Sequence, residues 1–230
     1  MPSLRGSDFR RVATAGPEFL LLAREHSLFR NNLEGADLRV PDGFGITLVS
    51  LLRGARIRRF PGADILHEIL ERAEKWNLPV FLAIRKDGLS SLGEIKKSLL
   101  TRYPRLLLSG IECERGAWEK CSRDFVQNSG SDQRISFEHL SPVVVLSNFG
   151  APEQEYFLES LRGKVESVRL VMGVGGSFDF VTGRLRRAPA LLRALGFEWL
   201  WRLFLQPHRF RRILRAVFQF PYYALKERRS

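Results

Sequence analysis

Short, almost continuously apolar runs alternate along this chain with segments of helical spacing. The apolar runs cover residues 79–84, 105–109, 142–147 and 168–174. Runs of this length without polar alternation are typical of strands buried on both faces of a parallel sheet. The helical segments between them cover residues 64–76, 91–102, 117–127 and 152–162. This order predicts an α/β fold, a Rossmann-like parallel sheet with helices on both faces, in which ligands bind at the carboxyl ends of the strands.

The composition allows one main hydrophobic core and contains no obvious membrane span. The chain has 230 residues, of which 44% are hydrophobic, and no apolar run approaches the roughly 20 residues that a spanning helix needs. The first residues form no hydrophobic signal segment, so we expect a cytoplasmic protein. Two cysteines, Cys113 and Cys121, suit a reducing compartment, and we expect no disulfide framework.

The net charge of +12 is concentrated at the C-terminal end. Residues 184–230 contain twelve Lys or Arg and two Glu, a balance of +10, which leaves +2 for the rest of the chain. A cationic segment of this kind binds nucleic acid, an anionic membrane surface or a phosphorylated substrate. We therefore predict an α/β core at residues 1–186 and a basic helical appendage at residues 187–230.

The pattern within this appendage favours a membrane surface. Five apolar residues recur at helical spacing: Phe210, Ile213, Leu214, Val217 and Phe218. Arginines occupy the other faces of this predicted helix. Such a helix lies in a lipid interface, or it packs on the core with a solvated arginine face. Aromatic residues at 218–223, followed directly by basic ones, favour peripheral membrane binding. Nucleic acid is the weaker reading, because no known recognition module is present.

A glycine pair follows the apolar run 168–174. Gly175 and Gly176 stand between this predicted strand and the arginines that begin at Arg184. Glycines at a strand end let backbone approach a ligand closely, or they serve the turn alone. The sequence FGAPEQE at 149–155 lies before this turn, and LGFEWLWRL at 195–203 lies after it.

These three blocks, in this order and spacing, resemble the WecG/TagA/CpsF family of bacterial glycosyltransferases, glycosyltransferase family 26. Further blocks extend the resemblance over nearly the whole chain: VATAGPEF at 12–19, ADLRVPDGFG at 36–45 and RFPGAD at 59–64. The resemblance implies that Asp42 is the catalytic base. By itself, an aspartate before a glycine is more typical of a turn residue that bonds its own backbone, and only the resemblance favours the base. A base is needed because inverting glycosyl transfer must remove the proton of the attacking hydroxyl.

The resemblance also assigns binding residues. Thr14, Arg59 and Gln154 match pocket residues, and Gly175 and Gly176 lie in the ligand-facing turn. The appendage arginines Arg202, Arg209 and Arg212 match residues that close over the active site, where guanidinium groups stabilise the diphosphate leaving group. Neither an Asp-x-Asp pair nor histidines at ligand spacing occur in the sequence, so we expect no metal and no cofactor.

Some positions depart from the family pattern. Gly16 stands where the family has an asparagine, and residues 84–88 replace its glycine-rich loop. These departures leave two hypotheses. One is a glycosyltransferase for a different sugar, with Gly16 lining the donor pocket. The other is a non-catalytic, degenerate family member that binds a lipid-linked sugar or a partner enzyme at the membrane.

The sequence favours the enzyme. We expect a metal-independent, inverting hexosyltransferase that moves an amino sugar of the N-acetylmannosamine type from a UDP-sugar to a polyprenyl-diphosphate-linked sugar. The resemblance places this reaction in cell-surface polysaccharide or teichoic acid synthesis, on the inner face of the cytoplasmic membrane. It also implies self-association into a homo-oligomer, and nothing points to a nucleic-acid partner.

Overall fold

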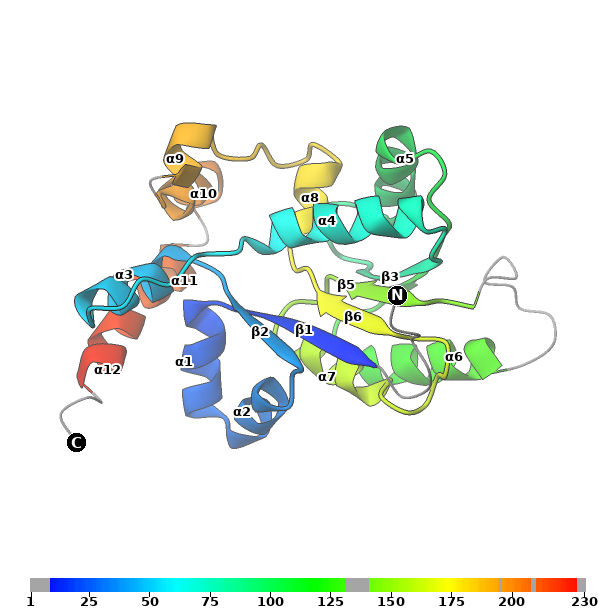
Figure 1. Ribbon diagram of the computed structural model, residues 1–230, viewed down its shortest axis with the longest axis horizontal. Coiled ribbons are helices and arrows are strands. Elements are labelled where there is room, and N and C mark those ends of the chain that lie inside the picture. Colours follow the sequence, from blue (N-terminus) through cyan, green and yellow to red (C-terminus); the bar gives the residue numbers. More distant parts are fainter. Residues whose placement is uncertain (1–8, 131–140, 195, 208–209, 227–230) are drawn as a thin grey trace. The chain divides into compact units, whose positions relative to one another are not determined.

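The computed structural model describes residues 9–130, 141–194, 196–207 and 210–226 (Figure 1). Six strands form one sheet in the order β2-β1-β6-β5-β3-β4. Their bounds are β1 Arg10–Ala15, β2 Leu38–Pro41, β3 Val80–Arg85, β4 Leu108–Cys113, β5 Val144–Ser147 and β6 Leu170–Gly173. The pairs β1–β6, β5–β6, β3–β5 and β3–β4 are all parallel. The prediction of an α/β fold built on a parallel sheet is therefore confirmed.

The bounds of β3, β5 and β6 agree with the predicted apolar runs to within two residues, whereas the bounds of β4 do not. The sequence predicts this strand at residues 105–109, whereas β4 runs from Leu108 to Cys113. The strand lies at the edge of the sheet; Gly110 and Ile111 are only partly buried and Glu112 is exposed. An edge strand has no continuous apolar pattern, so the apolar run marked its start and missed its end.

Helices connect the strands. Their bounds are α1 Pro17–Glu25, α2 Ser27–Glu34, α3 Phe44–Leu52, α4 Gly62–Lys75, α5 Leu92–Arg102, α6 Trp118–Gly130, α7 Glu153–Ser160, α8 Ser177–Val181, α9 Ala190–Ala194, α10 Glu198–Leu205, α11 Phe210–Leu214, the π-helix η2 Arg215–Gln219 and α12 Phe220–Lys226. The start of α5 shows why these segments are helical. The Ser91 side chain accepts a hydrogen bond from the Glu94 N–H while the Glu94 carboxylate accepts one from the Ser91 N–H, which forms a capping box.

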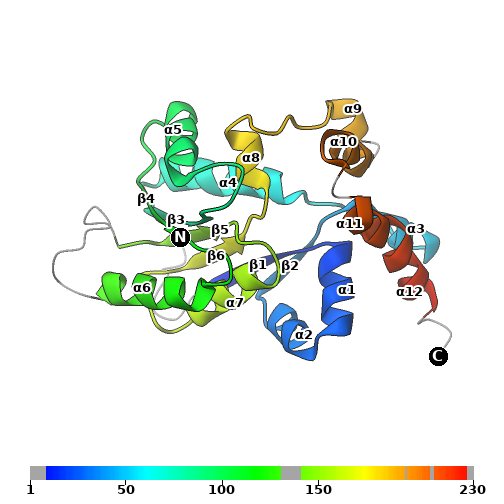
Figure 2. The same ribbon diagram turned by 180° about the vertical axis from the view of Figure 1, so that it is seen from behind.

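The chain divides into two compact units. Unit 1 contains residues 1–13, 35–38 and 63–184, and unit 2 contains residues 14–34, 39–62 and 185–230. Within unit 1, α4, α5 and α8 cover one face of the sheet, and α6 and α7 cover the other (Figures 1 and 2). The predicted boundary between residues 186 and 187 stays a prediction.

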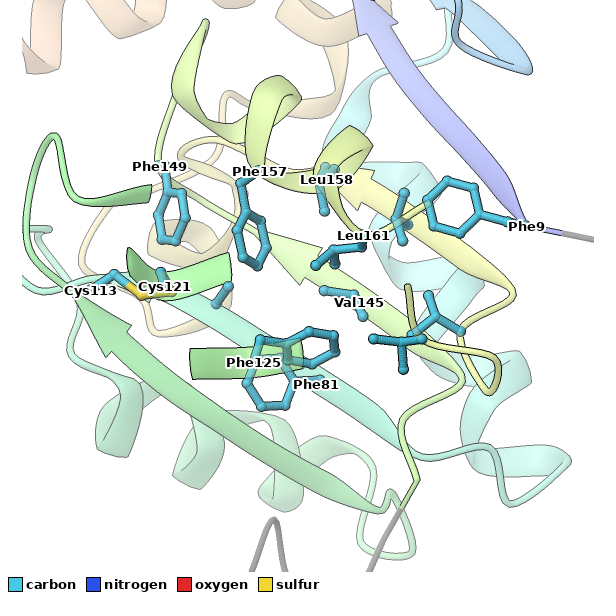
Figure 3. Close-up of a cluster of buried hydrophobic side chains, with 14 residues drawn as sticks. Phe9, Phe81, Cys113, Cys121, Phe125, Val145, Phe149, Phe157, Leu158 and Leu161 are labelled. Carbon is cyan, nitrogen blue, oxygen red and sulfur yellow. A yellow bond between two sulfur atoms is a disulfide. The ribbon is translucent and has the colours of Figure 1, made fainter. Parts of the chain in front are cut away.

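The core of unit 1 on the α6 and α7 side is aromatic (Figure 3). The Phe81 and Phe125 rings pack edge to face with centroids 4.6 Å apart, and Phe149 and Phe157 do so at 5.2 Å. Both cysteines join this cluster and form a Cys113–Cys121 disulfide. The expectation of two reduced cysteines is therefore wrong in this structure. Two cysteines eight residues apart gave no spacing signal, because a strand, a turn and a helix bring them together.

A buried ion-pair cluster joins β1 to α7 within unit 1. The Arg11 side chain is fully buried. Its Nε donates to Glu159 at 2.7 Å and its Nη1 donates to Glu155 at 3.1 Å. The Arg11 backbone N–H donates to Asp37 at 2.9 Å. Buried charges are tolerated only when they are paired and hydrogen-bonded, so this cluster fixes the position of β1 against α7.

In unit 2, α1, α3 and α12 pack on one another. Leu21 from α1, Val49 from α3 and Phe220 from α12 form the buried contact. The expected single apolar stripe of the appendage helix is wrong. Val217 is buried, but Phe210 is 51% exposed and Phe218 is 64% exposed. Phe210 lies in α11, whereas Val217 and Phe218 both lie in the π-helix η2, whose wider turn departs from the α-helical spacing that predicts the stripe.

Candidate active site

Asp42 lies just after β2, where the chain turns into α3. Its N–H donates to the Ala15 carbonyl at the end of β1, with 3.1 Å between nitrogen and oxygen. Gly43 has φ +101°, and a Cβ there would lie 2.9 Å from Pro17 Cδ. Only glycine fits this path. The ends of the two neighbouring strands thus set the position of Asp42, as the sheet order predicts.

The Asp42 carboxylate faces Gly62 and Thr14. Its Oδ2 accepts a hydrogen bond from the Gly62 N–H at 3.2 Å. A Cβ on Gly62 would lie 3.2 Å from Thr14 Cγ2 and 3.6 Å from Asp42 Oδ2. Gly62 lies in the RFPGAD block at 59–64, but no role for it followed from the sequence. Its place at the start of α4 is the signal that could have indicated this role, because the first residues of a helix present backbone N–H groups without a partner inside the helix.

Gly16 also contacts this loop. It precedes α1 with φ −94° and ψ 172°, a conformation open to any residue. A Cβ there would lie 3.2 Å from the Asp42 carbonyl oxygen. A side chain at this position therefore presses on the backbone of Asp42 itself.

Charges from the appendage reach Asp42 within unit 2. Burial raises the pKa of the Asp42 carboxyl above its usual range, and nearby Glu198 raises it further. The Gly62 hydrogen bond, Arg202 and Arg59 act in the opposite direction and lower this pKa. A carboxylate with a raised pKa holds a proton more readily, as a general base requires.

Two contacts hold α9 and α10 close to the Asp42 loop. Arg59 Nη2 donates to the Arg193 carbonyl at 2.8 Å. The Phe44 ring, two residues after Asp42, stacks on Phe197 with centroids 6.2 Å apart. A Cβ on Gly196, where φ is +82°, would lie 2.9 Å from Phe44 Cδ2. The contact of Phe44 with Phe197 could not be predicted from the sequence, because no local pattern links residues about 150 positions apart.

The appendage arginines differ in their surroundings. Arg202 lies in α10 and acts on Asp42 through its charge. Arg212 lies in α11, where its guanidinium pairs with Glu18 of α1. Arg209 falls outside the described residues. Of the predicted site residues, Thr14, Gly16, Arg59 and Arg202 are therefore the ones that lie near Asp42 in unit 2.

The other predicted site residues belong to unit 1. Gln154 is buried at the start of α7, where its Oε1 accepts from the Gly150 N–H at 3.1 Å and its Nε2 donates to Glu155 at 3.0 Å. Gly175 has φ +49°, and a Cβ there would meet no atom within 4 Å. Gly176 stands at the start of α8.

The described residues contain neither a metal-binding cluster nor a membrane-spanning helix. No group of three or more His, Cys, Asp or Glu side chains in the described ranges is placed to hold a metal ion. Among the same residues, no helix is long and apolar enough to cross a membrane.

Asp42 is thus a buried carboxylate that follows a strand of a parallel sheet, with Thr14 nearby and with the charges of Arg59 and Arg202 acting on it. The family model of the glycosyl transferase WecG/TagA/CpsF family matches residues 3–230, and the chain belongs to this family of glycosyltransferases. The prediction of the family and of a glycosyltransferase is confirmed.

Two curated relatives carry the same name, N-acetylglucosaminyldiphosphoundecaprenol N-acetyl-beta-D-mannosaminyltransferase. The protein from Bacillus subtilis (strain 168) is 29% identical over 216 residues, which cover 93% of this chain and 77% of the relative. The protein from Bacillus spizizenii is 27% identical over 206 residues, 88% of this chain and 74% of the relative.

Proposed function

We propose that this chain transfers an amino sugar of the N-acetylmannosamine type from a UDP-sugar to a polyprenyl-diphosphate-linked sugar, with inversion and without a metal ion. The observation that carries the proposal is the Asp42 carboxylate, which accepts the Gly62 N–H beside Thr14 and has a raised pKa. The names of the two Bacillus relatives support the substrate class.

In this proposal Asp42 acts as the base. It takes the proton from the acceptor hydroxyl while that oxygen attacks the anomeric carbon from the face opposite the leaving UDP, which inverts the configuration. Gly62 fixes the orientation of the carboxylate through its N–H. Thr14 and Gly16, which has no side chain, form part of the wall of the donor pocket.

Arginines take over the role of a cation. Arg59 and Arg202 lie close enough to lower the pKa of Asp42, and their guanidinium groups neutralise negative charge that develops on the leaving diphosphate. Arg212 reaches the phosphates only after it leaves Glu18. Arg209 completes the proposed clamp, and Gln154, Gly175 and Gly176 remain proposed binding residues of unit 1.

The membrane-linked acceptor places the reaction at a membrane surface. We propose peripheral binding on the inner face of the cytoplasmic membrane, through the basic C-terminal appendage. Self-association into a homo-oligomer is part of the same proposal.

The test combines donor binding and transfer. Thermal shift with a panel of UDP-sugars should show a rise in Tm with a UDP-amino sugar, because a ligand of the native state stabilises it by mass action. A transfer assay with a lipid-diphosphate-linked N-acetylglucosamine then follows the product in the presence of EDTA. Donor binding without any transfer would favour the degenerate family member, and activity that EDTA abolishes would refute metal independence.

A further inference from the structure

The C-terminal end of α3 and the loop after it expose a mixed apolar and cationic surface. We call this the 51–58 surface. It consists of Leu51, Leu52, Arg53, Arg56, Ile57 and Arg58, all exposed. Leu51 is 60% exposed, Leu52 57% and Ile57 45%. Adjacent exposed large apolar side chains are unusual on a soluble surface and mark an interaction site.

The charge of this surface is positive. The sequence between Asp42 and Asp64 contains no acidic residue. Among the described residues, no salt bridge involves Arg53, Arg56 or Arg58. Arg58 instead lies over the Phe60 ring, with its guanidinium carbon 5.4 Å from the ring centroid. A partner that supplies both apolar contact and negative charge fits these six residues.

Helix α12 continues the surface. Arg53 donates to the Ala224 carbonyl of α12, and the inner faces of α3 and α12 meet through Val49 and Phe220. Both views show α12 beside α3 (Figures 1 and 2). On its outer side α12 exposes Tyr222, with the Lys226 ammonium 5.8 Å from the centroid of its ring. An aromatic ring beside a lysine is typical of a membrane interface.

We propose that the 51–58 surface, together with α12, is a contact site for an anionic lipid bilayer, in which Leu51, Leu52 and Ile57 enter the interface and the arginines bind phosphate headgroups. The occupant follows from charge: arginine side chains that form no salt bridge with the described carboxylates, beside exposed leucines, complement an anionic lipid surface. The 51–58 surface is additional to the C-terminal appendage on which the proposed function relies, whereas α12 is part of that appendage.

The position of the surface gives it a purpose in the proposed reaction. Asp42 stands directly before α3, and the surface begins at the other end of this nine-residue helix. Nine helical residues span about 13 Å. A bilayer bound at the end of α3 would therefore hold the base about one helix length from the headgroups, where a lipid-linked sugar is presented. This step of the inference rests on the proposed function, whereas the lipid contact does not.

Vesicle binding tests the proposal with point variants of the full chain. The probes are vesicles of phosphatidylcholine with and without phosphatidylglycerol. Leu51→Gln with Leu52→Gln should weaken binding to both kinds of vesicle. Arg56→Gln with Arg58→Gln should weaken binding only to the phosphatidylglycerol vesicles, by about fivefold for each arginine. Arg53 is left unchanged because it bonds α12.

The matched control is Leu100→Gln with Arg102→Gln, an exposed leucine and arginine on α5 of unit 1. This variant should bind both kinds of vesicle like the unaltered chain. Unchanged binding of both 51–58 variants would overturn the proposal. So would a change of oligomeric state in the leucine variant without loss of vesicle binding, because the surface would then join two copies of the chain.

A second measurement separates this proposal from the proposed function. Calorimetric binding of UDP-sugars should be the same in the 51–58 variants as in the unaltered chain, which also shows that they are folded. If no UDP-sugar binds any form, the proposed function fails while the vesicle comparison still decides the lipid contact.

Discussion

Replacement of Asp42 by asparagine tests the proposed base. Asparagine has nearly the same shape, and its Oδ1 can still accept the Gly62 N–H that holds Asp42 at 3.2 Å. The variant therefore keeps the loop but cannot take up a proton. General base catalysis is worth roughly 10²–10⁴-fold, which corresponds to about 2.7–5.4 kcal/mol in the activation barrier.

The assay compares kcat/KM for transfer to a lipid-diphosphate-linked sugar across pH. In the unaltered chain, kcat/KM should fall as the pH drops through the folded pKa of Asp42, which burial holds above the usual aspartate range. Asp42→Asn should be slow at every pH and lose this acidic limb, with donor affinity unchanged. The control is Asp64→Asn, an exposed aspartate 22 residues further along. Full activity of Asp42→Asn would refute the assignment.

The same substitution has a stability consequence of known sign. Burial raises the folded pKa of Asp42 above the unfolded value of about 3.9. The folded state therefore binds the proton more tightly, and stability falls as the pH rises from the unfolded value to the folded pKa. The substituted asparagine carries no such cost, so at neutral pH Asp42→Asn should have the higher Tm. A lower Tm would contradict the unfavourable burial of the carboxylate.

Three further substitutions test neighbouring features. Gly16→Asn should lower turnover of the native donor, because the new Cβ crowds the Asp42 carbonyl oxygen at 3.2 Å. The Tm should change little, because φ −94° carries no strain for asparagine. A transfer assay measures turnover and a melting curve measures Tm; faster turnover would contradict this reasoning. Arg11→Met should lower the free energy of unfolding by about 3–5 kcal/mol, because it leaves the Glu155 carboxylate buried without its arginine partner. Urea unfolding measures this free energy, and a loss below about 1 kcal/mol would refute the burial argument. Phe44→Leu should speed proteolysis of residues 185–226 and lower kcat/KM, because it removes the ring that stacks on Phe197. The controls Phe44→Tyr, which keeps a ring, and Phe204→Leu, at an exposed position, should change neither quantity. Equal proteolysis of all three variants would contradict the stacking role.

Point variants are preferable to removal of the appendage. Phe220 of α12 packs on Leu21 and Val49, so a chain shortened before α12 would expose the core of unit 2. Loss of activity in such a chain would not separate a binding role of the appendage from a folding role.

The sequence predicted the parts of the structure that follow from local pattern. Continuous apolar runs identified β3, β5 and β6, because strands buried on both faces leave no polar position. The family resemblance selected Asp42 and Thr14. Their proximity follows from the fold, since loops after neighbouring parallel strands meet at one edge of the sheet.

Contacts between distant segments were beyond the sequence. Two arginines begin β1, and nothing in their sequence distinguishes them, yet Arg11 is buried by carboxylates about 150 residues away. The Gly62 N–H is a backbone group, which no side-chain pattern reports. Val217 and Phe218 are neighbours in the π-helix η2, yet Val217 packs inward while Phe218 is exposed. Each of these is decided by tertiary packing, which overrides local propensity.

The most direct test of the central claim is a transfer assay in EDTA. The purified chain is incubated with UDP-N-acetylmannosamine and a lipid-diphosphate-linked N-acetylglucosamine, and mass spectrometry and NMR examine the lipid product. We expect the acceptor to gain one N-acetylhexosamine, joined in the β-configuration if the donor is α-linked, and Asp42→Asn to form the product roughly 10²–10⁴-fold more slowly. No product from any UDP-amino sugar, despite measurable donor binding, would contradict the account.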